Sequence, residues 1–67
     1  MQPDAQLNRK VKAAFILIGE TLGGWCRERG YHQQNVRTAL MGGWDGPRAR
    51  EIRQELADYL NAKGAGI

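Results

Sequence analysis

The segment 21–40, TLGGWCRERGYHQQNVRTAL, constrains the fold of this chain more than any other stretch. Its apolar residues form two groups around Gly30: Trp25 and Cys26 precede it, and Val36, Ala39 and Leu40 follow it. The later group has the i, i+3, i+4 spacing of one buried helix face. Glycine commonly follows a helix because it enters the left-handed backbone region without strain. The segment therefore predicts two short helices, residues 22–29 and 33–41, joined by a turn.

Apolar residues at helical spacing also mark a longer helix near the N-terminus. Its stripe comprises Leu7, Val11, Ala14, Phe15 and Ile18. Asp4 is a suitable N-cap for this helix, and Gly19 is a natural stop. Ile16 and Leu17 widen the stripe, which predicts that this helix is covered on more than one side.

A fourth helix is predicted after Gly46, because Pro47 suits the first helical position, where its missing N–H costs nothing. Its buried stripe comprises Ala49, Ile52, Leu56, Tyr59 and Leu60. We expect Trp44, in the loop before this helix, to fold back on the core. No segment shows the sustained alternation of a strand. The sequence thus predicts an all-α, four-helix single domain over residues 1–67, ordered from about 4 to 62, with residues 1–3 frayed and 61–67 a loose tail.

The composition limits the classes of protein to which the chain can belong. At 67 residues it is near the lower size limit for folding without disulfides or metal. Cys26 is the only cysteine and His32 the only histidine, so we expect no disulfide, no zinc site and a buried Cys26. No secretory signal is recognisable, and the apolar run at 13–18 is too short to span a bilayer. We therefore expect a cytoplasmic protein with no cofactor and no membrane partner.

Positive charge is concentrated in the middle of the chain. The formal net charge is +3, and residues 27–53 contain six arginines but only three acidic residues. Arg48, Arg50 and Arg53 lie in the first two turns of the fourth helix, where the helix dipole disfavours cations. A bound phosphate would relieve this arrangement. The alternative is a solvated basic face, partly offset by Glu51 and Glu55.

The exposed face of the predicted 33–41 helix carries Gln33, Gln34, Arg37 and Thr38 and no carboxylate. Glutamine and arginine form hydrogen bonds with base edges, and threonine suits a phosphate or a thymine methyl group. His32, at the predicted N-cap, is expected to be a turn residue or a phosphate contact rather than a metal ligand. The pattern predicts a DNA-binding helix-turn-helix.

The segment GYHQQNVRTAL, residues 30–40, resembles the turn and recognition helix of lambda-repressor and Cro-like domains. Cys26 holds the small-residue position four before the turn glycine, and Val36 holds the branched apolar position six after it. The wider frame, T-L-x-x-W-C-R-E-x-G-Y followed by G-x-W-x-G-P-x-A, is similar to the Ner-like regulators of Mu-type phages and to anti-CRISPR-associated repressors. The Gly23-Gly24 pair departs from this pattern, since a helix former is usual there, and we expect it to let another helix approach closely.

The resemblance implies a sequence-specific regulator of double-stranded DNA, expected to be a repressor of a phage or prophage operon that binds an inverted repeat as a homodimer. By position it places base contacts at Gln33, Gln34, Arg37 and Thr38 and phosphate contacts at His32, Asn35 and Arg48, and the basic side chains Arg27 and Arg50 are added as phosphate contacts. The first helix, Trp44 and the C-terminal helix are candidates for the dimer interface.

Two alternatives to a DNA-binding regulator stay open. A small helical module that binds a protein, such as an anti-repressor or a phage complex subunit, would expose Trp44, Met41 and Ile16. An RNA binder is less consistent with the sequence, because few aromatic residues are free to stack on bases. We do not expect an enzyme, since the sequence offers no supported carboxylate pair or nucleophile–base set.

Overall fold

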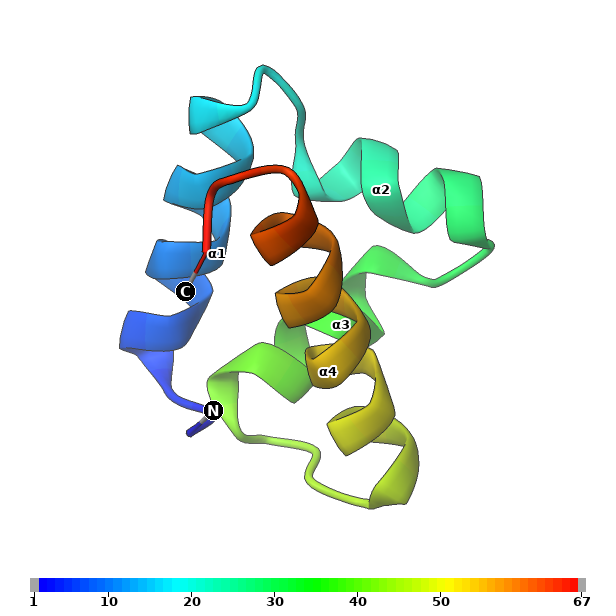
Figure 1. Cartoon of the computed structure of the whole chain (residues 1–67). Coiled ribbons are helices and arrows are strands. Elements are labelled where there is room, and N and C mark those ends of the chain that lie inside the picture. The colour runs from blue at the N-terminus through cyan, green and yellow to red at the C-terminus, as the bar shows by residue number, and fades with distance from the viewer. Residues whose placement is uncertain (1, 67) are drawn as a thin grey trace.

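The computed structural model describes residues 2–66. Four helices follow one another along the chain (Figure 1): α1 (Ala5–Leu17), α2 (Leu22–Arg29), α3 (Gln33–Met41) and α4 (Pro47–Ala62). The described part of the chain contains no strand. The prediction of an all-α, four-helix architecture is confirmed, and α2 and α3 have the predicted bounds.

Local hydrogen bonds explain where the first two helices begin. The Asp4 carboxylate accepts the Leu7 backbone N–H at 2.8 Å, and the Thr21 hydroxyl accepts the Gly24 N–H at 3.0 Å. Both bonds satisfy N–H groups that have no partner inside the helix. His32 takes the predicted N-cap position of α3, but its side chain makes no capping hydrogen bond.

The turn between α2 and α3 depends on Gly30, whose φ is +74°. This conformation lets the Tyr31 N–H bond to the Cys26 carbonyl at 2.9 Å, which closes the last turn of α2. The chain then needs only Tyr31 and His32 before α3 begins. The short connection fixes the direction in which α3 leaves α2.

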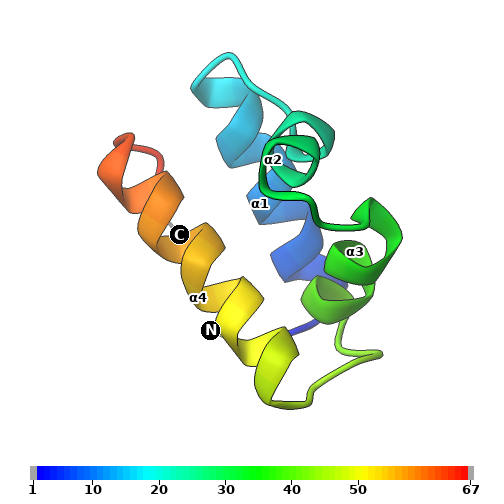
Figure 2. The same cartoon turned by 90° about the vertical axis from the view of Figure 1, so that its right-hand side faces the viewer.

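Helices α1 and α3 each pack against all three other helices, and the contact between α1 and α3 is the most extensive in the molecule. In Figure 2, α4 and α3 lie on the left and right of the view and α1 runs behind them. The core is formed by apolar side chains from all four helices: Leu7, Val11, Phe15, Leu22, Trp25, Cys26, Val36, Leu40, Ile52, Leu56 and Leu60. As predicted, Cys26 is buried, and this burial raises the pKa of its thiol.

Aromatic side chains join the helices at one side of this core. The Trp25 ring centroid lies 5.5 Å from that of Tyr31 and 6.5 Å from that of Tyr59, and Phe15 lies 6.2 Å from Tyr59. These separations are typical of favourable tilted pairs. Trp44 is half-buried and packs against the core, as expected for a residue that folds back from its loop.

Within residues 2–66 the chain covers α1 on one side only, so the prediction of coverage on more than one side is wrong for the single chain. Ile16 and Leu17 are 76% and 80% exposed. The other three helices all pack on the opposite face of α1, which carries Val11, Ala14 and Phe15. The broad apolar stripe of α1 therefore did not mean that the rest of this chain buries all of it.

Both ends of the described chain are more ordered than predicted. The tail does not leave the core after Ala62: the Ala65 N–H bonds to the Leu60 carbonyl at 2.9 Å, and Ala65 is buried. At the N-terminus, the Pro3 carbonyl oxygen lies so close to Gly42 that a Cβ there would approach it to 2.9 Å. The expectations for residues 1 and 67 fall outside the described residues.

Candidate nucleic-acid interface

One face of α3 presents polar side chains to solvent, because its opposite face, with Val36, Ala39 and Leu40, is buried. Gln33, Gln34 and Arg37 are exposed and share that face by their helical spacing. Met41, one turn beyond Arg37, is 41% exposed and extends the same face. The sequence analysis did not include Met41 in this face, although its i+4 spacing from Arg37 was sufficient to place it there.

Thr38 lies at the edge of this face and is half-buried. Its hydroxyl donates a hydrogen bond to the Gln34 carbonyl at 2.8 Å. The donor of the hydroxyl is therefore used within the helix, while its oxygen remains an acceptor. Of the two contacts predicted for Thr38, a contact with a thymine methyl group fits this geometry better than a hydrogen bond to a phosphate, because the hydroxyl hydrogen is already used.

The first residue of the face, Gln33, lies against α2. A Cβ on Gly23 would meet the Gln33 Oε1 atom at 3.0 Å, so glycine at this position leaves room for the glutamine. Gly23 thus accommodates a side chain from the start of another helix, whereas a Cβ on Gly24 would meet only Thr21 and Arg27. The expectation for the pair is confirmed for Gly23 alone. A hollow of about 240 Å³ beside this contact is also lined by Lys12 of α1.

The three arginines of α2 and α3 form no ion pair within residues 2–66, and only Arg29 lies over aromatic rings, those of Trp25 and Tyr59. The ion pairs formed within residues 2–66 involve other cations, and neither Arg27 nor Arg37 takes part in one. Both side chains are exposed. Since α3 carries no carboxylate, the positive charge of Arg37 is not neutralised along its own helix.

Arg48, in contrast, is held by protein groups at the start of α4. Its guanidinium donates to the Glu51 carboxylate at 2.9 Å and to the Tyr31 hydroxyl at 3.0 Å, and it lies over the Tyr31 ring at 5.1 Å. The Tyr31 hydroxyl in turn donates to Glu55 at 2.6 Å. We call these four residues the Tyr31 clamp, because they join the α2–α3 connection to α4.

The clamp affects the acid–base behaviour of Tyr31. The hydrogen bond to Glu55, followed by desolvation and by the charge of Glu55, raises the pKa of Tyr31, and Arg48 opposes the shift. The phenol therefore stays protonated and keeps its bond to Glu55 through the neutral range. The sequence analysis missed this contact because Tyr31 and Glu55 are 24 residues apart.

The other two arginines of α4 differ in burial. Arg50 is exposed, with its Nε atom 3.7 Å from Asp45. Arg53 is only 5% exposed, donates to the Ala39 carbonyl at 2.9 Å and pairs with Asp45. The hydrogen bond from Arg53 lowers the pKa of Asp45. Arg53 thus joins the end of α3 to α4 and is not available to a ligand.

His32 and Asn35 are both exposed. His32 lies just before α3 and leaves the first N–H groups of that helix without a side-chain cap. Asn35 is on the flank of α3, about a third of a turn from the Gln34–Thr38 side. Both side chains are accessible to a phosphate, but they do not share the face of α3 that carries Arg37.

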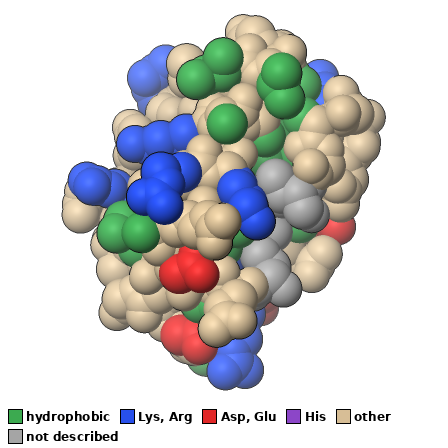
Figure 3. Space-filling view, turned by 90° about the vertical axis from the view of Figure 1, so that its left-hand side faces the viewer, with side chains coloured by type: hydrophobic (Ala, Val, Ile, Leu, Met, Phe, Trp, Pro, Cys, Tyr) green, Lys and Arg blue, Asp and Glu red, His purple; other side chains and the backbone are tan. Residues whose placement is uncertain are grey.

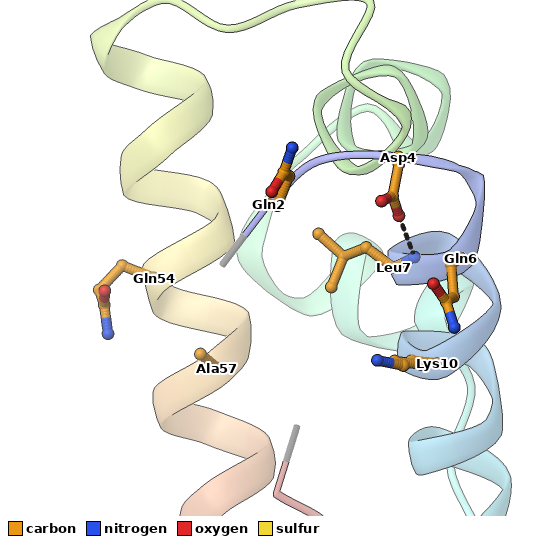
Figure 4. Close-up of a pocket in the computed structure, with 7 residues that line it drawn as sticks. All are labelled: Gln2, Asp4, Gln6, Leu7, Lys10, Gln54 and Ala57. Atoms are coloured by element: carbon orange, nitrogen blue, oxygen red, sulfur yellow. Dashed lines mark hydrogen bonds between the residues drawn. The ribbon is translucent and has the colours of Figure 1, made fainter.

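An open hollow of about 500 Å³ lies between α1 and α4, with Leu7 and Lys10 pointing toward α4 (Figure 4). The Asp4 carboxylate at its edge is engaged by the Leu7 N–H. Within residues 2–66 no three histidine, cysteine or acidic side chains gather in a way that could hold a metal ion.

No helix among the described residues has the length and apolar character needed to cross a membrane.

Comparison of the chain with known protein families, with curated proteins and with solved structures finds no match.

Proposed function

We propose that α2 and α3 form a helix-turn-helix and that the chain is a sequence-specific double-stranded DNA-binding protein. The observation that carries the proposal is the outer face of α3, where Gln33, Gln34 and Arg37 are exposed together and no carboxylate accompanies them. Further support comes from the packing of α3 against all three other helices, which leaves this polar face outward on a rigid support.

In this proposal α3 enters the major groove. Gln33 or Gln34 forms a bidentate contact with adenine N6 and N7, and Arg37 forms one with guanine O6 and N7. Each such pair contributes roughly 1–3 kcal/mol of discrimination against a wrong base. Thr38 and Met41 are placed to make apolar contacts at the edge of the same face.

Phosphate contacts come from the surrounding cations and from the start of α3. Arg27 and Arg50 are exposed, and the 3.7 Å separation of Arg50 from Asp45 is a weak pair that a phosphate can replace. The uncapped N-terminus of α3, next to His32, offers free N–H groups to an anion. Arg48 reaches a phosphate only if its contacts with Glu51 and Tyr31 rearrange.

A single domain of this size buries little surface on DNA, so we infer that it binds as a homodimer on two half-sites about one helical turn apart. The likeness of residues 30–40 to lambda-repressor and Cro-like domains favours a transcriptional role. Repression of a phage or prophage operon is the form of regulation that this likeness suggests.

A protein-binding module is the second candidate, because Ile16, Leu17 and Met41 are exposed. A module of this kind was expected to expose Trp44, but Trp44 is half-buried and packs against the core. The two functions differ in their response to salt. Phosphate contacts release counterions and weaken steeply as salt rises, whereas apolar contacts do not.

The test is a fluorescence anisotropy titration of a labelled random-sequence duplex, a single-stranded RNA of equal length and a labelled neutral peptide, each at two salt concentrations. Duplex binding that weakens steeply with salt supports the proposal. Binding to RNA alone, or no nucleic-acid binding at either salt, contradicts it.

Arg48→Ala distinguishes between two roles of Arg48: contact with a DNA phosphate and contact with Tyr31 in the Tyr31 clamp. If Arg48 contacts a phosphate, as predicted from the sequence, the variant should bind all duplexes more weakly. The slope of log affinity against log salt concentration should also become shallower by about 1. Weaker binding with an unchanged slope would instead show that Arg48 acts by holding Tyr31. Arg50→Ala, from the same helix turn, is the matched comparison.

A further inference from the structure

The outer face of α1 carries an apolar ridge that no described part of the chain covers. We define the α1 ridge as Ala13, Ile16 and Leu17, all exposed and brought onto one face by their i, i+3, i+4 spacing. Figure 3 shows this side of the molecule, with hydrophobic side chains gathered toward its upper end and Lys and Arg side chains below them. Single exposed apolar residues are ordinary, whereas contiguous exposed apolar patches are typical of contact surfaces.

A hollow adjoins the ridge on each side. Ile16 lies at the rim of the hollow of about 240 Å³ between α1 and α2, whose lining includes Phe15 and Leu22. Leu17 lies at the rim of a hollow of about 490 Å³, whose lining includes Ala65. Two copies can interlock across such a surface when the projecting apolar side chains of one copy enter the hollows of the other. Such self-complementarity is what a two-fold symmetric interface requires.

The charges next to the ridge have the same self-complementarity. Lys12 and Glu20 both line the hollow beside Ile16. Lys12 lies in α1 one turn before Ile16, and Glu20 lies in the connection that follows the end of α1 at Leu17. When two copies of α1 pack antiparallel with Ile16 near the two-fold axis, Lys12 of each copy comes to the same end of the interface as Glu20 of the other. Glu20 also accepts from the Tyr59 hydroxyl, while its contact with Lys63 is a loose 3.8 Å. A parallel arrangement would instead place like charges opposite one another.

We propose that the α1 ridge is a homodimer interface and that its occupant is the antiparallel α1 ridge of a second copy of this chain. Stable interfaces bury about 800 Å² per partner, roughly a fifth of the 4146 Å² accessible surface of this chain. A short ridge supplies only part of that area. The dimer is therefore reversible and depends on protein concentration.

This interface places the two α3 helices suitably for DNA, a consequence that rests on the proposed function. In Figure 2, α4 and α3 lie on opposite sides of the view, and α1 runs behind them. A two-fold axis perpendicular to α1, running from the α4 side to the α3 side, leaves both copies of α3 on the same side of the dimer. One duplex can then contact both outer faces.

The first test is the solution mass by sedimentation equilibrium, without DNA, across the micromolar range. We expect a monomer–dimer equilibrium for the wild type and a dissociation constant at least about tenfold higher for Leu17→Glu and Ile16→Glu. Met41→Glu is the matched control, because it places the same charge on an exposed apolar residue of another face and should leave the equilibrium unchanged. A monomeric wild type, or an unchanged mass for Leu17→Glu, overturns the proposal.

The second test uses the charges. Lys12→Glu and Glu20→Lys each place like charges opposite one another in a homodimer, whereas an equimolar mixture restores both opposite-charge pairs. We expect dimers in the mixture and not in either variant alone. Circular dichroism identifies a variant that fails to fold, and Lys12→Glu then decides alone, since an undiminished dimer contradicts the antiparallel arrangement. A dimer without duplex binding overturns only the proposed function, and a duplex-binding monomer overturns only this interface.

Discussion

Three arginines show how the same residue type takes different roles in this molecule. Arg37 is exposed without an acidic partner, Arg48 is stacked on Tyr31, and Arg53 is buried against the Ala39 carbonyl. The sequence predicted the exposure of Arg37 from helical spacing alone. The burial of Arg53 was also within reach, because it falls at i+4 from Ala49 and so lies on the buried stripe of α4.

Arg53→Met tests the structural role of the buried arginine. Methionine keeps much of the apolar volume but removes the donor to the Ala39 carbonyl, which leaves a buried acceptor without that partner. We expect the free energy of unfolding to fall by roughly 1–3 kcal/mol, measured by urea denaturation. Arg50→Met is the control, since the Arg50 side chain is exposed. Equal stability of the two variants would contradict the role given to Arg53.

Arg37→Ala tests base reading. If Arg37 bonds to guanine, its loss removes roughly 1–3 kcal/mol of preference at one base pair and leaves the preference at other positions intact. Competition among duplexes that differ at single positions measures this. Arg9→Ala removes an equal charge from the exposed side of α1 and should not change the preference. Undiminished selectivity of Arg37→Ala would refute the assigned contact.

At the scale of the elements, the bounds of α2 and α3 could be predicted because local signals set them. Thr21 caps α2, and Gly30 ends it through its positive φ. Contacts between distant segments could not be predicted in this way. The Tyr31 clamp joins residues 24 apart, and the exposure of Ile16 depends on which face of α1 the other helices choose. A periodic apolar pattern identifies a helix without identifying what covers it.

Gly23→Ala tests the contact between α2 and α3. Alanine raises helix propensity, and its Cβ would meet only the far end of the flexible Gln33 side chain, which can rotate away. We expect stability to rise by up to about 1 kcal/mol while the base preference attributed to Gln33 changes. Gly24→Ala is the comparison, because its Cβ would meet Thr21 instead. A stabilised variant with unaltered base preference would show that Gln33 does not read a base from this position.

Tyr31→Phe tests the clamp, because it removes the hydroxyl and keeps the ring beneath Arg48. We expect a loss of about 0.5–1.5 kcal/mol of stability. Since the folded state raises the pKa of Tyr31, the contribution of the hydroxyl is fully present below the unfolded pKa of about 10 and is lost as pH rises through the higher folded pKa. Urea denaturation from neutral to alkaline pH measures the difference between wild type and variant. A difference that persists unchanged at high pH would contradict the Tyr31–Glu55 bond.

At the scale of the whole molecule, the helices divide the surface into two faces with different chemistry. The outer face of α3 is polar and lacks carboxylates, and the α1 ridge is apolar. The separation accounts for how a chain of 67 residues could bind DNA and a second copy at once. The sequence predicted the polar face directly. It predicted the apolar one as extra width of α1, which it assigned to burial while also naming the first helix as a candidate dimer interface.

The most direct test of the central claim is selection from a random-sequence duplex pool, carried out with the wild type and with Gln34→Ala,Arg37→Ala. The account predicts an enriched motif with two-fold symmetry for the wild type, and loss or broadening of that motif for the double variant. Failure of the wild type to enrich any motif, or an identical motif for both proteins, would contradict the claim that α3 reads DNA sequence.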